Sequence, residues 1–162
     1  MSQPEPTKIL FVCTGNTCRS PMAEVLARHL SRSLPQLQFS SAGLFANPGA
    51  PATEQARKAV EERGLDLSGH RARQLTPDLV SEADVLVGLT GSHVQLMQEQ
   101  FPEAGRKIRS LHSFTAEPDR DVADPFGGNL DSYRKTRDEI ESALSDLLLT
   151  VISPMKKQQE EL

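Results

Sequence analysis

The stretch Lys8 to Glu24, KILFVCTGNTCRSPMAE, decides the fold. It opens with an apolar run of strand-forming residues, Ile9 to Val12, and continues into a polar loop that contains a glycine. Ser20 followed by Pro21 is typical of a helix start, with an N-cap residue and a proline in the first turn. The stretch therefore predicts a strand, a loop and a helix in direct succession.

The loop from Cys13 to Ser20 has the composition of an anion-binding site. Backbone N–H groups before a helix point toward a common centre, and the helix dipole adds partial positive charge there, so a phosphate-like group fits. The guanidinium of Arg19 can bind two anion oxygens. The same field would stabilise a thiolate at Cys13, which makes Cys13 a candidate nucleophile.

Strand and helix patterns alternate along the rest of the chain. Apolar periodicity and N-cap residues predict helices over 21–32, 53–63, 76–83, 92–100 and 129–153. Strand-forming runs occur at 39–42, 84–89 and 107–111. The predicted fold class is α/β, a three-layer sandwich with a four-stranded parallel sheet, helices on both faces and the anion-binding loop after the first strand.

Length and composition limit the organisation and the partners. For 162 residues we expect one domain over residues 8–153, after a disordered lead-in over 1–7 and before a charged tail over 154–162. The net charge of −4 argues against a nucleic-acid binder. The chain starts without the apolar segment of a signal peptide, and no apolar run is long enough to cross a membrane, so we expect a cytoplasmic protein without membrane contact.

Both cysteines of the chain lie in the loop, at Cys13 and Cys18. They leave no pair to join distant elements, and no Cys/His spacing suits zinc, so we expect no structural disulfide, metal or cofactor. Cys18 fits two roles. It can resolve an oxidised Cys13 as a disulfide, or it can be a small packing residue.

The Cys-x5-Arg-Ser spacing resembles the signature of the low-molecular-weight protein tyrosine phosphatase family. The positions that match its opening motif are Cys13, Gly15, Asn16, Cys18, Arg19, Ser20, Pro21, Ala23 and Glu24. Three later segments match in the family's order, Ser41 to Gly43, His70 to Gln74, and Asp124-Pro125. The resemblance implies a cysteine-dependent phosphatase, expected to be a monomer, whose partners are phosphorylated proteins.

Site residues follow from this resemblance, position by position. Cys13 is expected to form a cysteinyl-phosphate, Arg19 to bind the phosphoryl oxygens and Asp124 to act as general acid and then base. The expected substrate-binding residues are Thr14, Gly15, Asn16, Thr17, Cys18, Ser20 and Phe126.

Histidines and one serine complete the expected site. The resemblance gives His70 a supporting hydrogen bond near the loop. Ser41 resembles a serine that hydrogen-bonds beneath the loop, although a serine that satisfies a turn at a strand end fits the sequence equally well. The other histidines, predicted to be surface or turn residues, are His29, His93 and His112.

Two departures from the tyrosine-specific pattern concern the substrate. Thr17 replaces a larger aliphatic residue, and Phe126-Gly127-Gly128 replaces paired tyrosines, so the chain resembles the bacterial protein-arginine-phosphatase branch. Hydrolysis of phosphoarginine is the predicted function, and a tyrosine phosphatase is the alternative. An arsenate reductase is less favoured because no cysteine follows Cys18, and a non-catalytic binding module needs neither the thiol of Cys13 nor the acid of Asp124.

Overall fold

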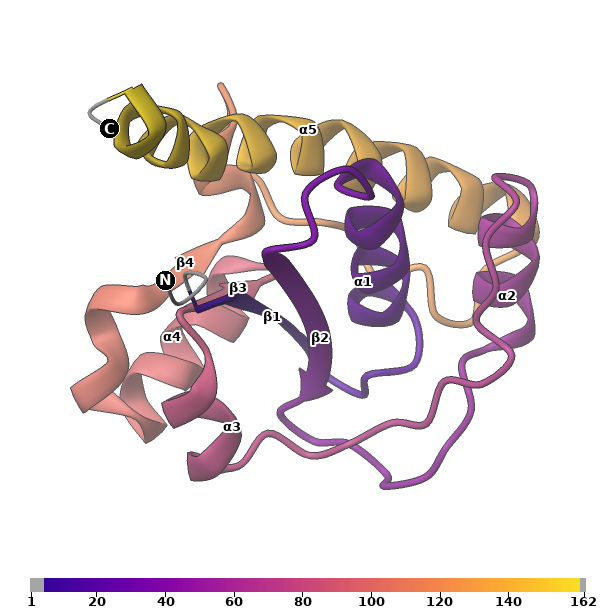
Figure 1. Cartoon of the computed structure of the whole chain (residues 1–162). Coiled ribbons are helices and arrows are strands. Elements are labelled where there is room, and N and C mark those ends of the chain that lie inside the picture. Colours follow the sequence, from indigo (N-terminus) through magenta and orange to yellow (C-terminus); the bar gives the residue numbers. More distant parts are fainter. Residues whose placement is uncertain (1–4, 161–162) are drawn as a thin grey trace.

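Four parallel strands form the centre of the molecule, in the order β2-β1-β3-β4 (Figure 1). The computed structural model describes residues 5–160, with side chains as far as residue 152. The strands are β1 (Thr7–Cys13), β2 (Leu37–Gly43), β3 (Val85–Gly88) and β4 (Ile108–Ser110). The predicted α/β fold with a four-stranded parallel sheet is confirmed, and the last strand lies at an edge as expected.

Helices cover both faces of the sheet, which gives the predicted three layers (Figure 1). The helices are α1 (Arg19–Leu30), α2 (Glu54–Glu61), α3 (Pro77–Glu82), α4 (Gly91–Gln100) and α5 (Leu130–Glu160). Because side chains alternate along a strand, Ile9 and Phe11 of β1 join the core beneath α1, α2 and α5. Leu10 and Val12 join the core on the α3 and α4 side. β1 is therefore buried on both faces and holds its carboxyl end firmly in place.

The carboxyl ends of three strands meet at one edge of the sheet. The pairing places Cys13 beside Gly43 and Val12 beside Gly88. Gly43 lies so close to the loop that an added Cβ would be 2.6 Å from the carbonyl oxygen of Thr14. A side chain at this position would displace the loop, so the glycine is required by the close approach.

Element boundaries differ from the predictions at several places. α1 begins at Arg19 rather than Pro21, and β2 begins at Leu37 because this residue pairs with Thr7, which had been assigned to the lead-in. Two 3₁₀ turns that the sequence did not predict are η1 (Pro102–Lys107) and η2 (Leu111–Phe114).

α5 is longer than predicted, since its backbone continues to Glu160 instead of ending at residue 153. Residues 1–4 of the predicted lead-in and 161–162 of the predicted tail lie outside the described residues. Within the described part of the chain, no helix has the length and apolar content needed to span a membrane.

Candidate active site

Cys13 is the last residue of β1 and lies at the base of the loop that leads into α1. It is buried, and its sulfur lies 2.9 Å from Ser20 Oγ in the first turn of α1. The predicted N-cap role of Ser20 is wrong, because Cys18 holds the N-cap position and makes no side-chain capping bond. As the second residue of the helix, Ser20 can donate a hydrogen bond from its hydroxyl to a thiolate at Cys13.

Hydrogen bonds of the buried residue Asn16 stabilise the loop. It is fully buried and has a positive φ of 58°, a conformation that asparagine tolerates better than most residues. Its Nδ2 donates to Ser20 Oγ at 2.9 Å, and its Oδ1 accepts from the backbone N–H of Arg73 at 3.0 Å. The backbone carbonyl of Asn16 accepts from His70 Nε2 at 2.7 Å, which brings His70 to the loop. These hydrogen bonds fix the conformation of the loop.

The second half of the loop packs against α2 and α5. The carbonyl of Thr17 accepts from the backbone N–H of Thr53, the N-cap residue of α2, and a Cβ added to Gly15 would lie 3.7 Å from Thr17 Oγ1. Cys18 Sγ lies 3.3 Å from the hydroxyl of Tyr133 on α5. Burial and this hydrogen bond raise the pKa of Tyr133 to about 12. At neutral pH the phenol therefore keeps its proton and can donate it to the sulfur.

Arg19 connects the loop to the segment that carries the predicted acid. Its guanidinium is almost fully buried, with Nη1 donating to the carbonyl of Val122 at 2.8 Å. Nη2 lies 3.6 Å from Asp124 Oδ2, a contact long enough to be an ion pair without a good hydrogen bond. Val122 is itself fixed, because its N–H donates to the carbonyl of Leu89 at the end of β3. The structure thus brings Cys13, Arg19 and Asp124 to one edge of the sheet.

Two exposed phenylalanines flank this edge. Phe126, two residues after Asp124, donates its backbone N–H to Asp124 Oδ1 and leaves 71% of its surface exposed. Phe45, 64% exposed, donates its N–H to the carbonyl of Thr14 and so follows the loop directly. The sequence predicted Phe126 but missed Phe45. Phe45 lies two residues after the matched Ser-Ala-Gly segment, and this closeness could have pointed to it as a residue near the site.

His93 also lies beside the loop, and its predicted surface position is wrong. The ring is buried, and Nε2 lies 3.0 Å from Thr14 Oγ1. Burial, followed by the positive charge of Arg19, lowers the pKa of His93 to about 4. The ring is therefore neutral at pH 7. No local pattern indicates this contact, because 79 residues separate His93 from Thr14 in the chain.

His112 is buried too, so its predicted surface position is wrong, although it does lie in a turn, the 3₁₀ turn η2. Its Nε2 lies 3.0 Å from Glu139 Oε2 on α5, and Nδ1 lies 3.2 Å from Thr115 Oγ1. Of the three histidines expected at the surface, only His29 is exposed. Among the described residues, no three His, Cys, Asp or Glu side chains are placed to hold a metal ion.

Ser41 does not make the hydrogen bond to the loop that the resemblance implied. Its hydroxyl donates to Glu24 Oε1 of α1 at 3.0 Å, and its carbonyl accepts from Arg73 Nε at 2.8 Å. The reason is the packing of α1 on β2, which places the carboxylate of Glu24 within reach of the hydroxyl. Ser41 therefore joins a strand to a helix, and it stays outside the loop's own hydrogen bonds.

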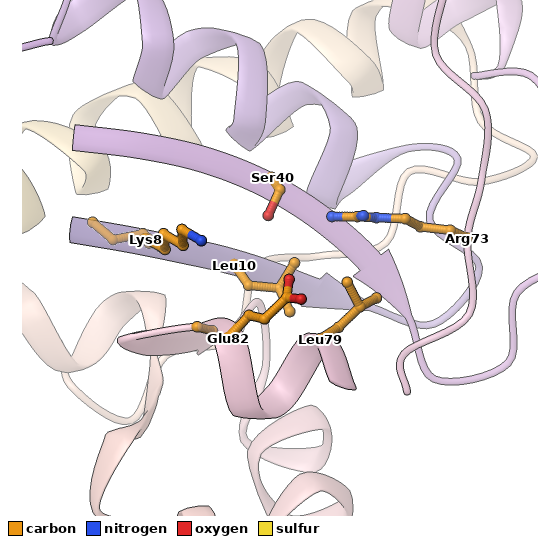
Figure 2. A pocket seen from close by; sticks show the side chains of 8 residues that line it. Lys8, Leu10, Ser40, Arg73, Leu79 and Glu82 are labelled. Atoms are coloured by element: carbon orange, nitrogen blue, oxygen red, sulfur yellow. The ribbon is translucent and has the colours of Figure 1, made fainter. Parts of the chain in front are cut away.

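A small cavity of about 70 Å³ lies away from this edge. Figure 2 shows Leu79 and Glu82 of α3 directed toward β1 and β2, with Ser40 and Arg73 on the other side of the space. None of its lining residues belongs to the loop between Cys13 and Ser20. The cavity is too small for a phosphorylated side chain, so the edge with Cys13 remains the candidate site.

The fold and the loop define a class. A buried cysteine at the base of an anion loop, an arginine six positions later and an aspartate facing that arginine are the elements of a cysteine-dependent phosphatase. The sequence model described as low molecular weight phosphotyrosine protein phosphatase matches residues 8–161. The chain belongs to this family.

Individual relatives agree with the family match. The protein-arginine-phosphatase of Geobacillus stearothermophilus is 42% identical over 142 residues, which cover 88% of this chain and 94% of the relative. The protein-arginine-phosphatase of Bacillus subtilis is 41% identical over 140 residues, 86% of this chain and 93% of the relative. A solved structure of the arginine phosphatase YwlE, a cysteine-to-serine variant with a phosphorylated active-site serine, superposes with a TM-score of 0.87 at 38% identity, covering 91% of this chain and 97% of the other.

Proposed function

We propose that this enzyme hydrolyses phosphoarginine residues of proteins through a cysteinyl-phosphate intermediate. The observation that carries the proposal is the arrangement of Cys13, Ser20, Arg19 and Asp124 around one loop, with the sulfur 2.9 Å from Ser20 Oγ and Arg19 Nη2 3.6 Å from Asp124. The similarity to protein-arginine-phosphatases supports the choice of substrate. The monomeric state and the cytoplasmic location stay predictions from the sequence.

In the first step the thiolate of Cys13 attacks phosphorus, and the bond from phosphorus to the guanidinium nitrogen breaks. The loop amides and Arg19 hold the phosphoryl oxygens as charge develops on them. Asp124, in its acid form, gives its proton to the leaving nitrogen, so that arginine departs with its electron pair and the new proton. Asp124 is half-exposed at the mouth of the site, where a departing group passes.

In the second step water attacks the phosphocysteine. Asp124, now a carboxylate, takes a proton from this water, and the bond from phosphorus to sulfur breaks. Ser20 donates its hydrogen bond to the departing thiolate, which lowers the barrier to its release. Inorganic phosphate and the free thiolate are the products, and the cycle can restart.

Thr17 and Phe126 distinguish the proposed substrate from phosphotyrosine. Thr17 is partly exposed in the loop, and its hydroxyl, at 3.8 Å, makes only a weak contact with Cys18 Sγ, so it can bind an N–H of the guanidinium. Phe126 offers an exposed aromatic face on which a planar guanidinium can stack. A tyrosine phosphatase with the same chemistry is the second candidate, and the name of the matching family favours it.

The test compares Thr17→Ile with Thr17→Ser on phosphoarginine and phosphotyrosine peptides. Ile removes the hydroxyl and keeps the β-branch, whereas Ser keeps the hydroxyl. A lost hydrogen bond of about 1–3 kcal/mol predicts that Thr17→Ile lowers kcat/KM on phosphoarginine roughly ten- to hundredfold, with less effect on phosphotyrosine. Thr17→Ser should keep the wild-type preference. A wild-type enzyme that prefers phosphotyrosine would establish the second candidate instead.

A further inference from the structure

His93 has a polar atom that the proposed mechanism does not explain. Among the described residues, its Nδ1 is one of two buried side-chain nitrogen or oxygen atoms without a hydrogen-bond partner. Such atoms are costly, so the position needs a reason. Its other ring nitrogen, Nε2, lies 3.0 Å from Oγ1 of Thr14, the residue that follows the nucleophile Cys13 in the sequence.

The position of His93 is fixed by the first turn of α4. Thr90, the N-cap residue, accepts from the backbone N–H of His93 at 3.2 Å, which orients this turn. Gly88, at the end of β3, makes room for the ring: a Cβ added there would lie 3.1 Å from the Cβ of His93. The backbone of β3 and α4 thus holds the imidazole against the loop.

The hydrogen-bond partners decide which ring nitrogen carries the proton. A neutral ring has one N–H, and placing it on Nδ1 would bury a donor without an acceptor. The proton therefore belongs on Nε2, which donates to Thr14 Oγ1. Thr14 is exposed, so the second lone pair of its oxygen and its own hydroxyl proton remain available at the mouth of the site.

The contact lies on the side of the loop where the leaving group departs. The acid segment meets α4 at Gly91, two residues before His93, and the charges of Arg19, Asp124 and Asp121 influence the pKa of the ring. Asp121 accepts from the N–H of Gly91 at 2.8 Å and holds the acid segment against the same end of α4. The contact between His93 and Thr14 therefore lies at the end of α4 that the acid segment also meets.

We propose that His93 is a positioning residue that fixes the hydroxyl of Thr14 as a specificity contact for the guanidinium of phosphoarginine. This inference rests on the proposed function, because the guanidinium supplies the N–H groups that Thr14 Oγ1 accepts. The bridging ester oxygen of phosphotyrosine has no N–H to offer, so phosphotyrosine cannot use Thr14 Oγ1 as an acceptor. The neutral ring adds no positive charge that would repel a guanidinium.

The experiment measures kcat/KM on phosphoarginine and phosphotyrosine peptides for variants of both residues. Thr14→Val and His93→Leu should each lower the ratio of phosphoarginine to phosphotyrosine activity about tenfold, mainly through KM, and the double variant should lower it no further. His93→Gln, whose amide N–H can replace Nε2–H, should recover most of the ratio, and His93→Asn, whose amide is too short, should not. Ser92→Ala, exposed on the same turn of α4, is the matched control.

The outcomes separate the two proposals. If the wild type prefers phosphoarginine and the variants lower both activities equally, or the effects of the two residues add, the positioning role is wrong while the proposed function stands. If the wild type prefers phosphotyrosine, both are overturned. Because Thr14 is exposed, Thr14→Val keeps the test decisive even if a His93 variant folds poorly.

Discussion

The anion loop and the acid segment face each other across Arg19, but they are built differently. In the loop, residues 14–18, the central Asn16 is fully buried and hydrogen-bonds to Ser20, Arg73 and His70. The acid segment, residues 115–128, is largely exposed, apart from the buried Val122 and Pro125. Its later hydrogen bonds are local, such as the one from Phe126 N–H to Asp124.

This difference corresponds to the two tasks of the site. Stabilising charge on a phosphoryl group requires donors that are fixed before the substrate arrives, because reorganising them would cost part of the gain. An acid that first protonates a leaving group and then activates water must adjust to two partners. The anchors at Val122 and Asp121 limit this adjustment to the last few residues of the segment.

The largest effect is expected in the loop itself, from Cys13→Ser. The loop should keep its structure, because the serine hydroxyl can still interact with Ser20, but the hydroxyl will not ionise there. We expect turnover to fall at least about a thousandfold on either substrate with little change in Tm. Steady-state kinetics and thermal unfolding measure both quantities. Turnover that persists in this variant contradicts Cys13 as the nucleophile.

Asp124→Asn tests the exposed acid segment. The amide cannot give or take a proton, so kcat should fall roughly a hundredfold or more. Stability should change by less than about 0.5 kcal/mol, because the carboxylate is half-exposed and 3.6 Å from Arg19. Asp119→Asn, exposed in the same segment, is the control for a lost charge. An equal loss of activity in both variants would mean that segment charge matters rather than a specific acid.

The sequence predicted the parts of the site that are local. The apolar run Ile9 to Val12, the loop and the helix after it form a continuous stretch, and each has its own propensity signal. Strand-helix alternation predicted the four-stranded parallel sheet but not the order of its strands, and the resemblance pointed to Asp124. The first residue of α1 was harder to predict. Ser20 is a good N-cap residue by propensity, but in the structure its hydroxyl faces Cys13.

Contacts between distant segments could not be predicted in the same way. His93 reaches Thr14 only because β3 lies beside β1 and Gly88 leaves room for the ring. Ser41 meets Glu24 because α1 packs on β2. Such contacts depend on the assembled tertiary structure, so neither the apolar pattern of the sequence nor the spacing of its motifs predicts them.

Asn16→Ala tests whether the loop is preorganised. Alanine at a φ of 58° is strained, and the N–H of Arg73 loses its acceptor, so we expect a loss of about 2–3 kcal/mol in the free energy of unfolding. Inorganic phosphate should also bind more weakly. Asn16→Gly removes the same hydrogen bonds without the strain. Urea unfolding of the two variants therefore separates the cost of backbone strain from the cost of the lost hydrogen bonds. Unchanged stability in both variants would show that the loop does not depend on the side-chain hydrogen bonds of Asn16.

The smallest effect concerns acid stability and the ring of His93. Burial and Arg19 lower its pKa in the folded state to about 4, from an ordinary value of 6.5. Between these values the unfolded chain binds a proton that the folded protein does not, so stability is complete above about pH 6.5 and declines as pH falls toward 4.

His93→Gln has no ring to protonate and should therefore lose less stability over this range than the wild type, by on the order of 1 kcal/mol after allowance for solvent screening. Urea unfolding of both proteins at pH 7 and pH 4.5 measures the difference. Nearby Asp121 and Asp124 are present in both proteins, so the two proteins differ only in the side chain at position 93. Equal slopes with pH would show that the ring is solvated in the folded protein.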